Sequence, residues 1–440
     1  MNPRQLTLSL LDEYEAMGKY VNLSLSSHRL DGLSREERGV VTALLYTTVE
    51  HKLTYDYILS AIAKRSADEM DIHTLNLLRL GCAQLLDMDR ISDHTAVNET
   101  VKIARNKGER GFVNGVLRSL IRLRDGGALP MPERAKNPAR FLSVAYSFPI
   151  ELVRHFISLF GETEAEQLLN TFNNDNYTDL TVNISRISRD ELCARLAKQG
   201  IAATPSSISP LSVRIDGSCD PRTLYGFSDG LFFVQDASCS LSALALGTKS
   251  GDAVIDVCAC PGGKSFAAAI LAGEGGSVTS CDLHDSKLSL VVSGAERLGL
   301  SSITVLQNDA TIPRVEFFGK FDRVICDVPC SGLGVLGKKA DLRYNSYETM
   351  DRLPELQYSI LTASANYLND GGTLLYSTCT LNPAENGENV IRFLNEHPEF
   401  TAADFSVGGI CSEGGMLTLV PHIHRTDGFF IAKLEKRKNL

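Results

Sequence analysis

Two cysteines occupy turns from which a thiol could reach a bound small molecule. Cys330 lies in DVPCSGLGVL (327–336) and Cys379 in YSTCT (376–380), and each follows the carboxyl end of an expected strand. A thiolate is both a nucleophile and a metal ligand, so the pair could form a covalent intermediate, exchange protons with a substrate, or hold an ion. Most cysteines are small buried residues, and the position in a turn sets these two apart.

A metal site is the competing interpretation of these thiols. Its ligands would be Cys258, Cys260, Cys330 and Cys379. No paired CxxC motifs occur, and the four residues come from three separate loops, which is not the spacing of a structural zinc site. His422 and His424 alternate on an expected terminal strand, where a structural role is the simpler interpretation. We therefore predict that the protein binds no metal.

A cofactor site is expected beside the same turns. The loop PGGKS (261–265) follows a strand in VIDVCAC, and Gly262 and Gly263 would let its backbone approach a ligand. The loop lacks the spacing of a Walker motif and of the dinucleotide fingerprint, so phosphate binding is not required. The next three strands end in an aspartate each, namely Asp282, Asp309 and Asp327. Carboxylates at one sheet edge can accept hydrogen bonds from ribose hydroxyls, which favours S-adenosylmethionine over a dinucleotide.

Thiols beside a methyl donor suggest one reaction. Carbon 5 of cytosine is a poor nucleophile, but a thiolate that adds to carbon 6 makes carbon 5 reactive enough to take a methyl group from a sulfonium. A base must then remove the carbon 5 proton so that the thiolate can leave. The two cysteines could share these steps.

The elements that would position these residues begin near residue 250. Apolar strands and amphipathic helices alternate from DAVIDVCA to GTLLYSTCT, which predicts a parallel sheet covered by helices on both faces. Ligands of such folds lie beyond the carboxyl ends of the strands. The candidate residues should therefore share one edge of the sheet.

The first 235 residues indicate a helical part followed by a small mixed part. Apolar residues recur with helical spacing in the first 125 residues, for example Leu75, Leu78, Cys82 and Leu85. The stretch 125–142 is rich in glycine, proline and charge, as linkers are. From about residue 147 to residue 235 strand and helix patterns alternate, which predicts a small α+β domain.

A basic segment closes the helical part. Residues 101–124, VKIARNKGERGFVNGVLRSLIRLR, hold seven Lys/Arg against the single Glu109, and an apolar stripe through Val113, Val116, Leu117 and Leu120 remains for packing. A solvated helix face is the simpler interpretation of such a charge run. Phosphate binding is the sharper alternative.

The composition is that of a soluble globular protein with free thiols. The 440 residues are 43% hydrophobic without an apolar run of eighteen, and Asp12, Glu13 and Glu15 fall where a signal peptide would be apolar. We therefore expect a cytoplasmic protein that does not enter a membrane. Eleven cysteines without framework spacing indicate free thiols, and the net charge of -9 argues only mildly against a polyanionic partner.

The sequence resembles the bacterial 16S rRNA cytosine carbon-5 methyltransferases of the RsmB/Sun (Fmu) type, in the NOL1/NOP2/Sun family, over nearly the whole chain. The matching motifs are FVQDAS (233–238), DVCACPGGKS (256–265), CDLHDSKL (281–288), FDRVICDVPCSGLGVL (321–336), YSTCTLNPAENGENV (376–390) and DGFF (427–430). The resemblance implies three domains: an all-α NusB-like RNA-binding domain (1–130), a small α+β RNA-binding segment (145–235), and a Rossmann-like class I methyltransferase domain (236–440). It also favours RNA binding by the basic segment.

Residue roles follow from the same resemblance. It implies that Cys379 is the nucleophile and that Cys330 assists product release. Asp282 would bind ribose, Asp309 would lie near adenine, and Asp327 would lie beside the reactive end. The cofactor loop would comprise Cys258, Ala259, Cys260, Pro261, Gly262, Gly263 and Lys264.

Two positions depart from the family pattern. Cys260 stands where the family loop usually carries alanine, which leaves the backbone path unchanged, so we expect cofactor binding to survive. Ala340 replaces a frequent proline in GKKADLRY (337–344), an expected RNA-contacting loop whose Lys338, Lys339 and Arg343 supply positive charge.

We therefore predict a monomeric enzyme that methylates carbon 5 of a cytosine in 16S ribosomal RNA with S-adenosylmethionine. The base must leave its stack to reach a thiol, so single-stranded or partly unfolded RNA is the expected partner. Alternatives are an acceptor such as tRNA, a non-catalytic RNA-binding assembly factor, and a methyltransferase for proteins or small molecules. The pair of thiols disfavours the last two.

Overall fold

The computed structural model describes residues 2–17, 30, 32–217, 219–344 and 347–438. The chain forms two compact units, of which the first comprises Met1–Asn173 with Leu336–Asn345 and the second comprises Asn174–Val335 with Ser346–Leu440. Among the residues described, no helix is both long enough and apolar enough to cross a membrane. The division at residue 173 does not test the linker expected at 125–142, which stays a prediction.

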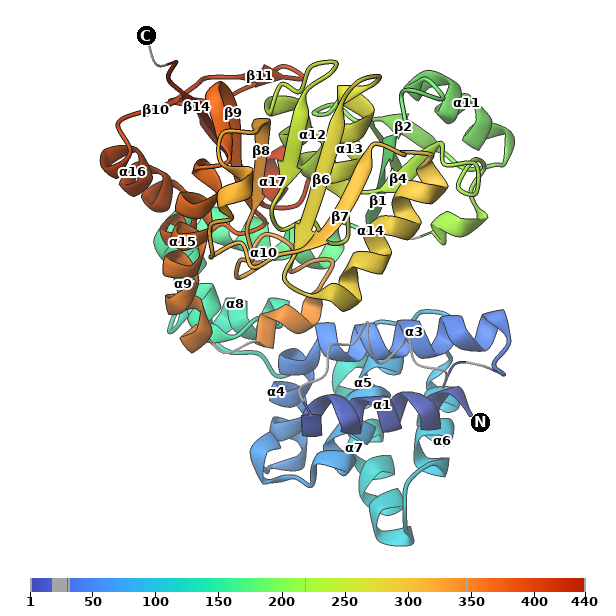
Figure 1. Cartoon of the computed structure of the whole chain (residues 1–440). Coiled ribbons are helices and arrows are strands. Elements are labelled where there is room, and N and C mark those ends of the chain that lie inside the picture. Colours follow the sequence, from blue (N-terminus) through green and yellow to red (C-terminus); the bar gives the residue numbers. More distant parts are fainter. Residues whose placement is uncertain (1, 18–29, 31, 218, 345–346, 439–440) are drawn as a thin grey trace. The chain divides into compact units, whose positions relative to one another are not determined.

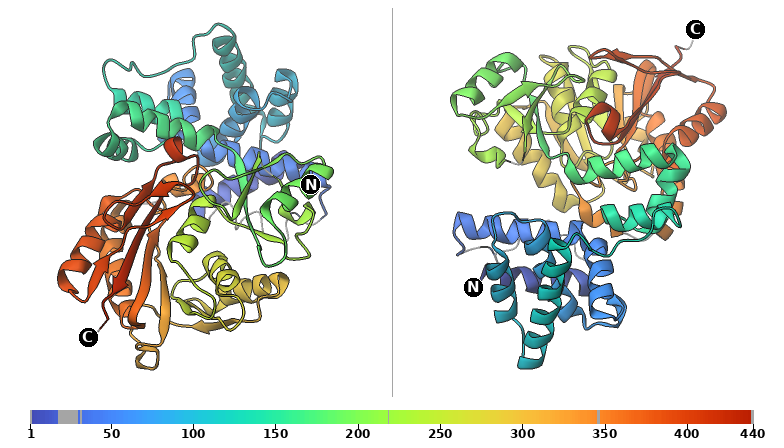
Figure 2. Two further views of the ribbon diagram at one scale, coloured as in Figure 1. Left: turned by 90° about the horizontal axis from the view of Figure 1, so that it is seen from above. Right: turned by 180° about the vertical axis from the view of Figure 1, so that it is seen from behind.

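The first unit is helical, as the spacing of its apolar residues predicts. Its helices α1 (Pro3–Met17), α3 (Arg35–Glu50), α4 (Lys52–Ala63), η2 (Ala67–Glu69), α5 (Ile72–Leu86), α6 (Asp93–Lys102), α7 (Lys107–Asp125), α8 (Pro138–Tyr146), α9 (Ile150–Phe160) and α10 (Glu162–Asn174) are drawn from blue to green in Figure 1 and Figure 2. The short helix η5 (Ala340–Tyr344), from a later part of the chain, also belongs to this unit. The core contains Leu78 and Cys82 of α5 together with Val113 and Leu117 of α7. Burial of these apolar faces stabilises the bundle.

Helix α7 has the amphipathic geometry that its sequence predicts. Val113, Val116, Leu117 and Leu120 are buried, whereas the basic residues Lys107, Arg110, Arg118 and Arg122 are exposed. Other basic residues of the segment serve the fold, because Arg105 pairs with Glu109 (2.9 Å) and Arg124 pairs with Asp93 (2.6 Å). The exposed basic face is therefore smaller than the charge count suggests.

The loop 337–344 differs from the prediction that Arg343 offers its charge to RNA. Arg343 is only 1% exposed. Its guanidinium donates to the carbonyl oxygens of Leu336 (3.2 Å) and Glu50 (3.3 Å) and lies 4.0 Å from the centre of the Phe148 ring. The residue is a structural part of the first unit, whereas Lys338 and Lys339 are exposed as expected.

The second unit begins with a small α+β part, as predicted. Its elements are β1 (Tyr177–Val182), α11 (Arg189–Lys198), β2 (Ala203–Pro205), β3 (Ser212–Asp216), η3 (Pro221–Thr223) and β4 (Phe232–Val234). The strands form an antiparallel sheet in the order β2-β3-β1-β4. Leu192 and Leu196 of α11 pack with Leu180 and Val213 of this sheet and close a separate small core.

The rest of the second unit surrounds a large mixed sheet. Its elements are α12 (Ala237–Ala245), β5 (Ala253–Asp256), α13 (Gly263–Ala272), β6 (Ser277–Asp282), α14 (Asp285–Leu298), β7 (Ile303–Gln307), η4 (Val315–Phe317), β8 (Phe321–Asp327), η6 (Tyr347–Arg352), α15 (Leu353–Ala365), β9 (Leu368–Thr378), η7 (Pro383–Glu385), α16 (Gly387–Glu396), β10 (Phe400–Ala402), β11 (Ser406–Val407), β12 (Ile410–Cys411), β13 (Met416–Leu419), α17 (Pro421–His424) and β14 (Phe429–Lys436). The order is β10-β14-β9-β8-β5-β6-β7, and β13 also pairs with β14. Strands β5 to β9 are parallel and β14 is antiparallel to β9. The expected parallel sheet is thus confirmed, with an antiparallel addition at β14.

Alternating side chains on the strands pack against helices on the two faces. Ile325 and Leu375 belong to the core formed with α12 and α13, whereas the adjacent Val324 and Leu374 belong to the core formed with α15 and α16. Both faces are therefore covered, as parallel sheets require. The order reverses between β5 and β8, and ligands of open α/β sheets bind at the carboxyl ends of the strands at such a point.

Candidate active site

The predicted residues gather at the carboxyl edge of the parallel sheet. Asp282 and Asp327 are the last residues of β6 and β8, and Cys379 directly follows β9. Asp309 lies two residues beyond β7 rather than at its end, and its carboxylate accepts hydrogen bonds from the amide and hydroxyl of Thr311 (2.9 and 2.6 Å). Parallel register brings these strand ends to one edge, as the sequence predicts.

The two glycines of the loop after β5 lie close to other side chains of the protein. Gly262 has φ +114°, and a Cβ there would lie 2.5 Å from the Phe266 ring. A Cβ at Gly263 would lie 2.6 Å from the side chain of Gln235. A side chain at position 262 would meet the Phe266 ring, whereas at position 263 the end of the Gln235 side chain could shift, and the predicted approach of a ligand to both glycines stays a prediction.

The groups beside this loop suit an uncharged nucleoside. Asp282 accepts hydrogen bonds from the amides of Cys260 (3.2 Å) and His284 (3.0 Å), and each of its oxygens can accept a further bond. The backbone amide of the neighbouring Asn308 donates to the backbone carbonyl of Asp282. The side-chain nitrogen Nδ2 of Asn308 is buried and has no hydrogen-bond partner in the protein. A group with hydroxyl donors and an acceptor atom, such as the nucleoside of S-adenosylmethionine, fits these residues.

Lys264 and Asp327 form an ion pair between the cofactor loop and the end of β8. Lys264 Nζ lies 2.6 Å from Asp327 Oδ2, and Ser377 donates to the other carboxylate oxygen (2.7 Å). Burial is the largest single effect and lowers the pKa of Lys264, but the charge and hydrogen bond of Asp327 together with Cys239 and Asp256 outweigh it and raise the pKa. The lysine therefore carries its charge in the site, 5.0 Å from the centre of the Phe429 ring.

The two thiols face each other across the β8 and β9 turns. The Sγ atoms of Cys330 and Cys379 are 3.2 Å apart, and the amide of Cys379 donates to Cys330 Sγ (3.3 Å). The hydrogen bond with Cys379 and then burial hold the pKa of Cys330 well above its ordinary value. Cys330 therefore keeps its proton and can donate it to the sulfur of Cys379.

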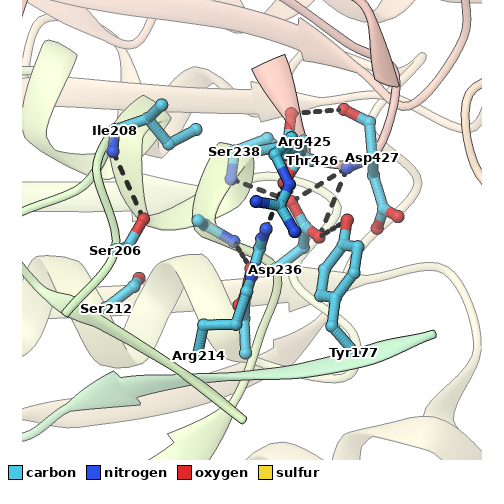
Figure 3. A network of polar contacts seen from close by, with 12 residues as sticks. Tyr177, Ser206, Ile208, Ser212, Arg214, Asp236, Ser238, Arg425, Thr426 and Asp427 are labelled. Carbon is cyan, nitrogen blue, oxygen red and sulfur yellow. Dashed lines mark hydrogen bonds and ion pairs between the residues drawn. The ribbon is translucent and has the colours of Figure 1, made fainter. Parts of the chain in front are cut away.

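The motif FVQDAS meets the motif DGFF through the carboxylate of Asp236. Figure 3 shows this carboxylate between Tyr177 and the segment 425–427. It accepts hydrogen bonds from the hydroxyl of Tyr177 (3.1 Å), the amide of Ser238 (2.9 Å) and the amide of Asp427 (3.3 Å). The small antiparallel sheet is thereby tied to the start of β14.

Arg214 completes this network. It binds Asp179 through two hydrogen bonds (2.8 and 2.7 Å), lies 3.7 Å from the centre of the Tyr177 ring, and donates to the Arg425 carbonyl (2.5 Å). Bidentate arginine–carboxylate pairs fix orientation as well as charge. The backbone of residues 425–427 is consequently held from two sides (Figure 3).

Two glycines connect the segment 425–427 to the turn that carries Cys379. The amide of Gly428 donates to the carbonyl of Gly334 (2.8 Å), and the amide of Gly334 donates to the carbonyl of Cys379 (2.9 Å). A Cβ on Gly334 would lie 1.9 Å from the Gly428 carbonyl oxygen, so the backbones can approach only as glycines. Sequence reasoning treated DGFF as a family marker, and the structure gives this structural reason for it.

The metal interpretation gains no support from the geometry. Within the described part of the chain no group of three or more His, Cys, Asp or Glu side chains could hold an ion. Burial raises the pKa of Cys258 well above its ordinary value, and burial followed by Asp282 raises the pKa of Cys260 to about 12, so both thiols are neutral. His422 and His424 lie in the short helix α17, not on a strand as predicted, and His424 Nδ1 accepts from the Val420 amide (2.8 Å).

A sheet with this strand order, a nucleoside-type site and two apposed thiols define a methyltransferase of the class that carries its cofactor at the carboxyl edge of the sheet. The sequence profile of the 16S rRNA methyltransferase RsmB/F family matches residues 243–435. The NusB family matches residues 1–122, and the RsmF/B-like ferredoxin-like domain matches residues 148–222. Similar curated proteins are the probable ribosomal RNA small subunit methyltransferases B of Bacillus subtilis (strain 168), 36% identical over 99% of this chain and 98% of the relative, and of Synechocystis sp. (strain ATCC 27184 / PCC 6803 / Kazusa), 34% identical over 99% and 100%. The chain belongs to the RsmB/F family, and S-adenosylmethionine is its cofactor.

Solved structures share the fold. "Crystal Structure of PH0851" covers 99% of both chains at 23% identity with a TM-score of 0.79. The NSun6 protein from Pyrococcus horikoshii, solved with SFG, covers 67% of this chain and 100% of its own at 22% identity with a TM-score of 0.60. The predicted order of a NusB-like domain, a small α+β domain and a methyltransferase domain is confirmed.

Proposed function

We propose that the protein methylates carbon 5 of a cytosine in 16S ribosomal RNA through a covalent bond between Cys379 and the base. The observation that carries the proposal is the 3.2 Å approach of the Cys330 and Cys379 sulfur atoms at the edge of the sheet that bears Asp282 and Asp327. Both relatives described above are named as small subunit ribosomal RNA methyltransferases. A cytosine-specific reaction needs the nucleophile that this pair supplies.

Different residues of the site would bind the cofactor and orient the reacting groups. Asp282 would bind the ribose of the cofactor, the loop from Cys258 to Lys264 its methionine part, and Asp309 would lie near the adenine. Asp327 lies between Lys264 and Ser377 and would orient the reacting groups. S-adenosylmethionine supplies an electrophilic methyl group when it is bound.

Cys379 attacks as its thiolate after its thiol proton has passed to solvent, while Cys330 keeps its own proton and donates a hydrogen bond to the Cys379 sulfur. Its sulfur adds to carbon 6, which makes carbon 5 nucleophilic. The bond to carbon removes the negative charge from the Cys379 sulfur and with it the main cause that raises the pKa of Cys330. Cys330 can then release its proton to solvent, take the proton from methylated carbon 5, and allow the Cys379 thiolate to leave.

Variants of the two thiols test this division. Cys379→Ala should abolish methyl transfer to 16S RNA, whereas Cys330→Ala should accumulate a protein–RNA adduct that migrates slowly on a denaturing gel. Cys411→Ala, which removes an exposed thiol, is the matched control and should behave as the wild type. Mass spectrometry of nucleosides identifies the product. Full turnover by Cys379→Ala, or a methyl group on any atom other than carbon 5 of cytosine, would contradict the proposal.

A further inference from the structure

A buried carboxylate is hydrogen-bonded to the residue that follows Cys330. Glu385, at the end of η7, is 0% exposed, and among the described ion pairs it has none with a lysine or arginine. Neutral donors from three separate segments surround it instead. Burying an ionised carboxylate without a cation is unfavourable unless hydrogen bonds satisfy both of its oxygens.

The contacts of Glu385 satisfy both oxygens and join the two thiol loops. Oε1 accepts from the hydroxyl of Ser331 (2.5 Å) and from Asn382 Nδ2 (3.0 Å), and Oε2 accepts from the amide of Ser331 (2.9 Å) and from Gln357 Nε2 (2.8 Å). Ser331 directly follows Cys330 in the chain, and its hydroxyl lies 2.7 Å from the Thr380 hydroxyl. Thr380 directly follows Cys379, so one carboxylate connects the residues behind both sulfurs.

The adjacent Asn386 holds the other side of the Cys379 turn. Its Oδ1 accepts from the hydroxyl of Thr378 (2.5 Å), and its Nδ2 donates to the carbonyl of Thr380 (2.9 Å). These two contacts bracket Cys379 within the chain. The amide of Asn382 also donates to the Thr380 hydroxyl (3.2 Å). The hydrogen bonds of the segment 382–386 thus reach the residues that flank the two thiols.

We propose that Glu385 is a positioning residue that fixes the Cys330 loop against the Cys379 loop and supplies a negative charge that keeps the proton on Cys330. The inference rests on the proposed function for its role in catalysis, but not for its effect on the thiols. Four hydrogen bonds of Glu385 support its role in fixing the two loops. The electrostatic role is supported because Glu385 is among the groups that raise the pKa of Cys330, after Cys379 and burial.

The test compares Glu385→Gln with Glu388→Gln, which makes the same change at an exposed residue three positions further on. Alkylation of Cys330 and Cys379 by iodoacetamide is followed by peptide mass spectrometry from pH 6 to pH 10 without RNA or cofactor. Removing one negative charge should lower the pKa of Cys330, so alkylation of Cys330 at a pH below that pKa should be severalfold faster than in the wild type. Glu388→Gln should leave the pH profile unchanged. A Cys330 profile in Glu385→Gln identical to that of the wild type would overturn the proposal.

Methyl transfer by the same variants separates positioning from a purely structural role. Glu385→Gln should lower kcat at least tenfold while KM for RNA stays within twofold, because the residue contacts no substrate. Equal losses in kcat and in folded fraction would indicate a structural role only and would count against the proposal. If the wild type transfers no methyl group to cytosine, the proposed function fails while the alkylation result still decides this inference. Should Glu385→Gln not fold, Ser331→Ala removes one of the four bonds but keeps the charge, so it must lower kcat while the alkylation profile of Cys330 stays that of the wild type.

Discussion

Asp256 offers a direct test of how the sheet edge is built. The residue ends β5 and is 1% exposed. Its Oδ2 accepts a hydrogen bond from Ser265 (2.8 Å), whereas no hydrogen bond of normal geometry reaches Oδ1. Burial raises its pKa to about 7, with smaller opposing effects from Ser265, Lys264 and the amide of Cys258. The folded protein thus prefers the neutral acid where an exposed aspartate would be ionised.

The sign and size of the effect on stability follow from this pKa. Below pH 3.8 both folded and unfolded chains hold the proton, so the residue contributes no pH dependence. Between pH 3.8 and about 7 only the folded chain holds it, and the free energy of unfolding falls as the pH rises. A pKa difference of about three units corresponds to a loss of about 4 kcal/mol, which is complete above pH 7.

Asp256→Asn should remove that loss, because the amide has the shape of the neutral acid and cannot ionise. Urea unfolding of wild type and variant at fixed pH values from 4.5 to 8 would show the variant gaining on the wild type by about 3 kcal/mol over this range. Ser265→Ala removes a hydrogen bond that favours the carboxylate and should extend the decline to higher pH. A difference between Asp256→Asn and wild type that stays constant within about 0.5 kcal/mol over this range would refute the reasoning.

Two further predictions concern the first unit. Arg343→Met should lower the stability of this unit by about 2 kcal/mol, because the carbonyls of Leu336 and Glu50 lose their donors. Calorimetry should show an unfolding transition about 4–8 °C lower, and Lys339→Met, at an exposed lysine, is the control that should leave it unchanged. Unchanged stability together with weaker RNA binding would instead assign Arg343 to RNA contact. Replacing Arg110, Arg118 and Arg122 of α7 by glutamine should weaken RNA binding and reduce the slope of log affinity against log salt by about 0.7 per lost contact. An unchanged slope in filter-binding titrations would leave the basic face of α7 as a solvated surface only.

Residues whose place depends on strand direction could be predicted from the sequence. Asp282, Asp327 and Cys379 lie at the edge expected of them because parallel strands separated by helices must end on the same side. The helical spacing of α7 likewise separates buried Val113 from exposed Arg118 without any knowledge of neighbours. The face of a helix on which a residue lies and the sheet edge at which a strand ends both follow from the spacing of apolar residues along the chain.

Residues whose place depends on distant partners could not be predicted. Arg343 follows two lysines in a charged stretch, and only Glu50 and Phe148, far away in the sequence, make its burial possible. The same holds for Glu385, which reads as an ordinary acidic residue near a helix start. Its donors Ser331 and Gln357 come from other segments of the second unit. Residue type and spacing do not specify such pairings.

The protonation states of the two thiols depend on these distant contacts, and the proposed reaction requires them to change in a fixed order. Cys330 must keep its proton while Cys379 is a thiolate, and must lose it once Cys379 is bonded to the base. The bond to the base removes the influence of Cys379, and burial and Glu385 then still raise the pKa of Cys330 while the hydrogen bond from the Gly332 amide lowers it. A buried cation in place of Glu385 would favour two thiolates and leave no proton to distinguish them. A carboxylate held by neutral donors preserves that distinction, because it adds one negative charge without supplying a cation that would stabilise the second thiolate.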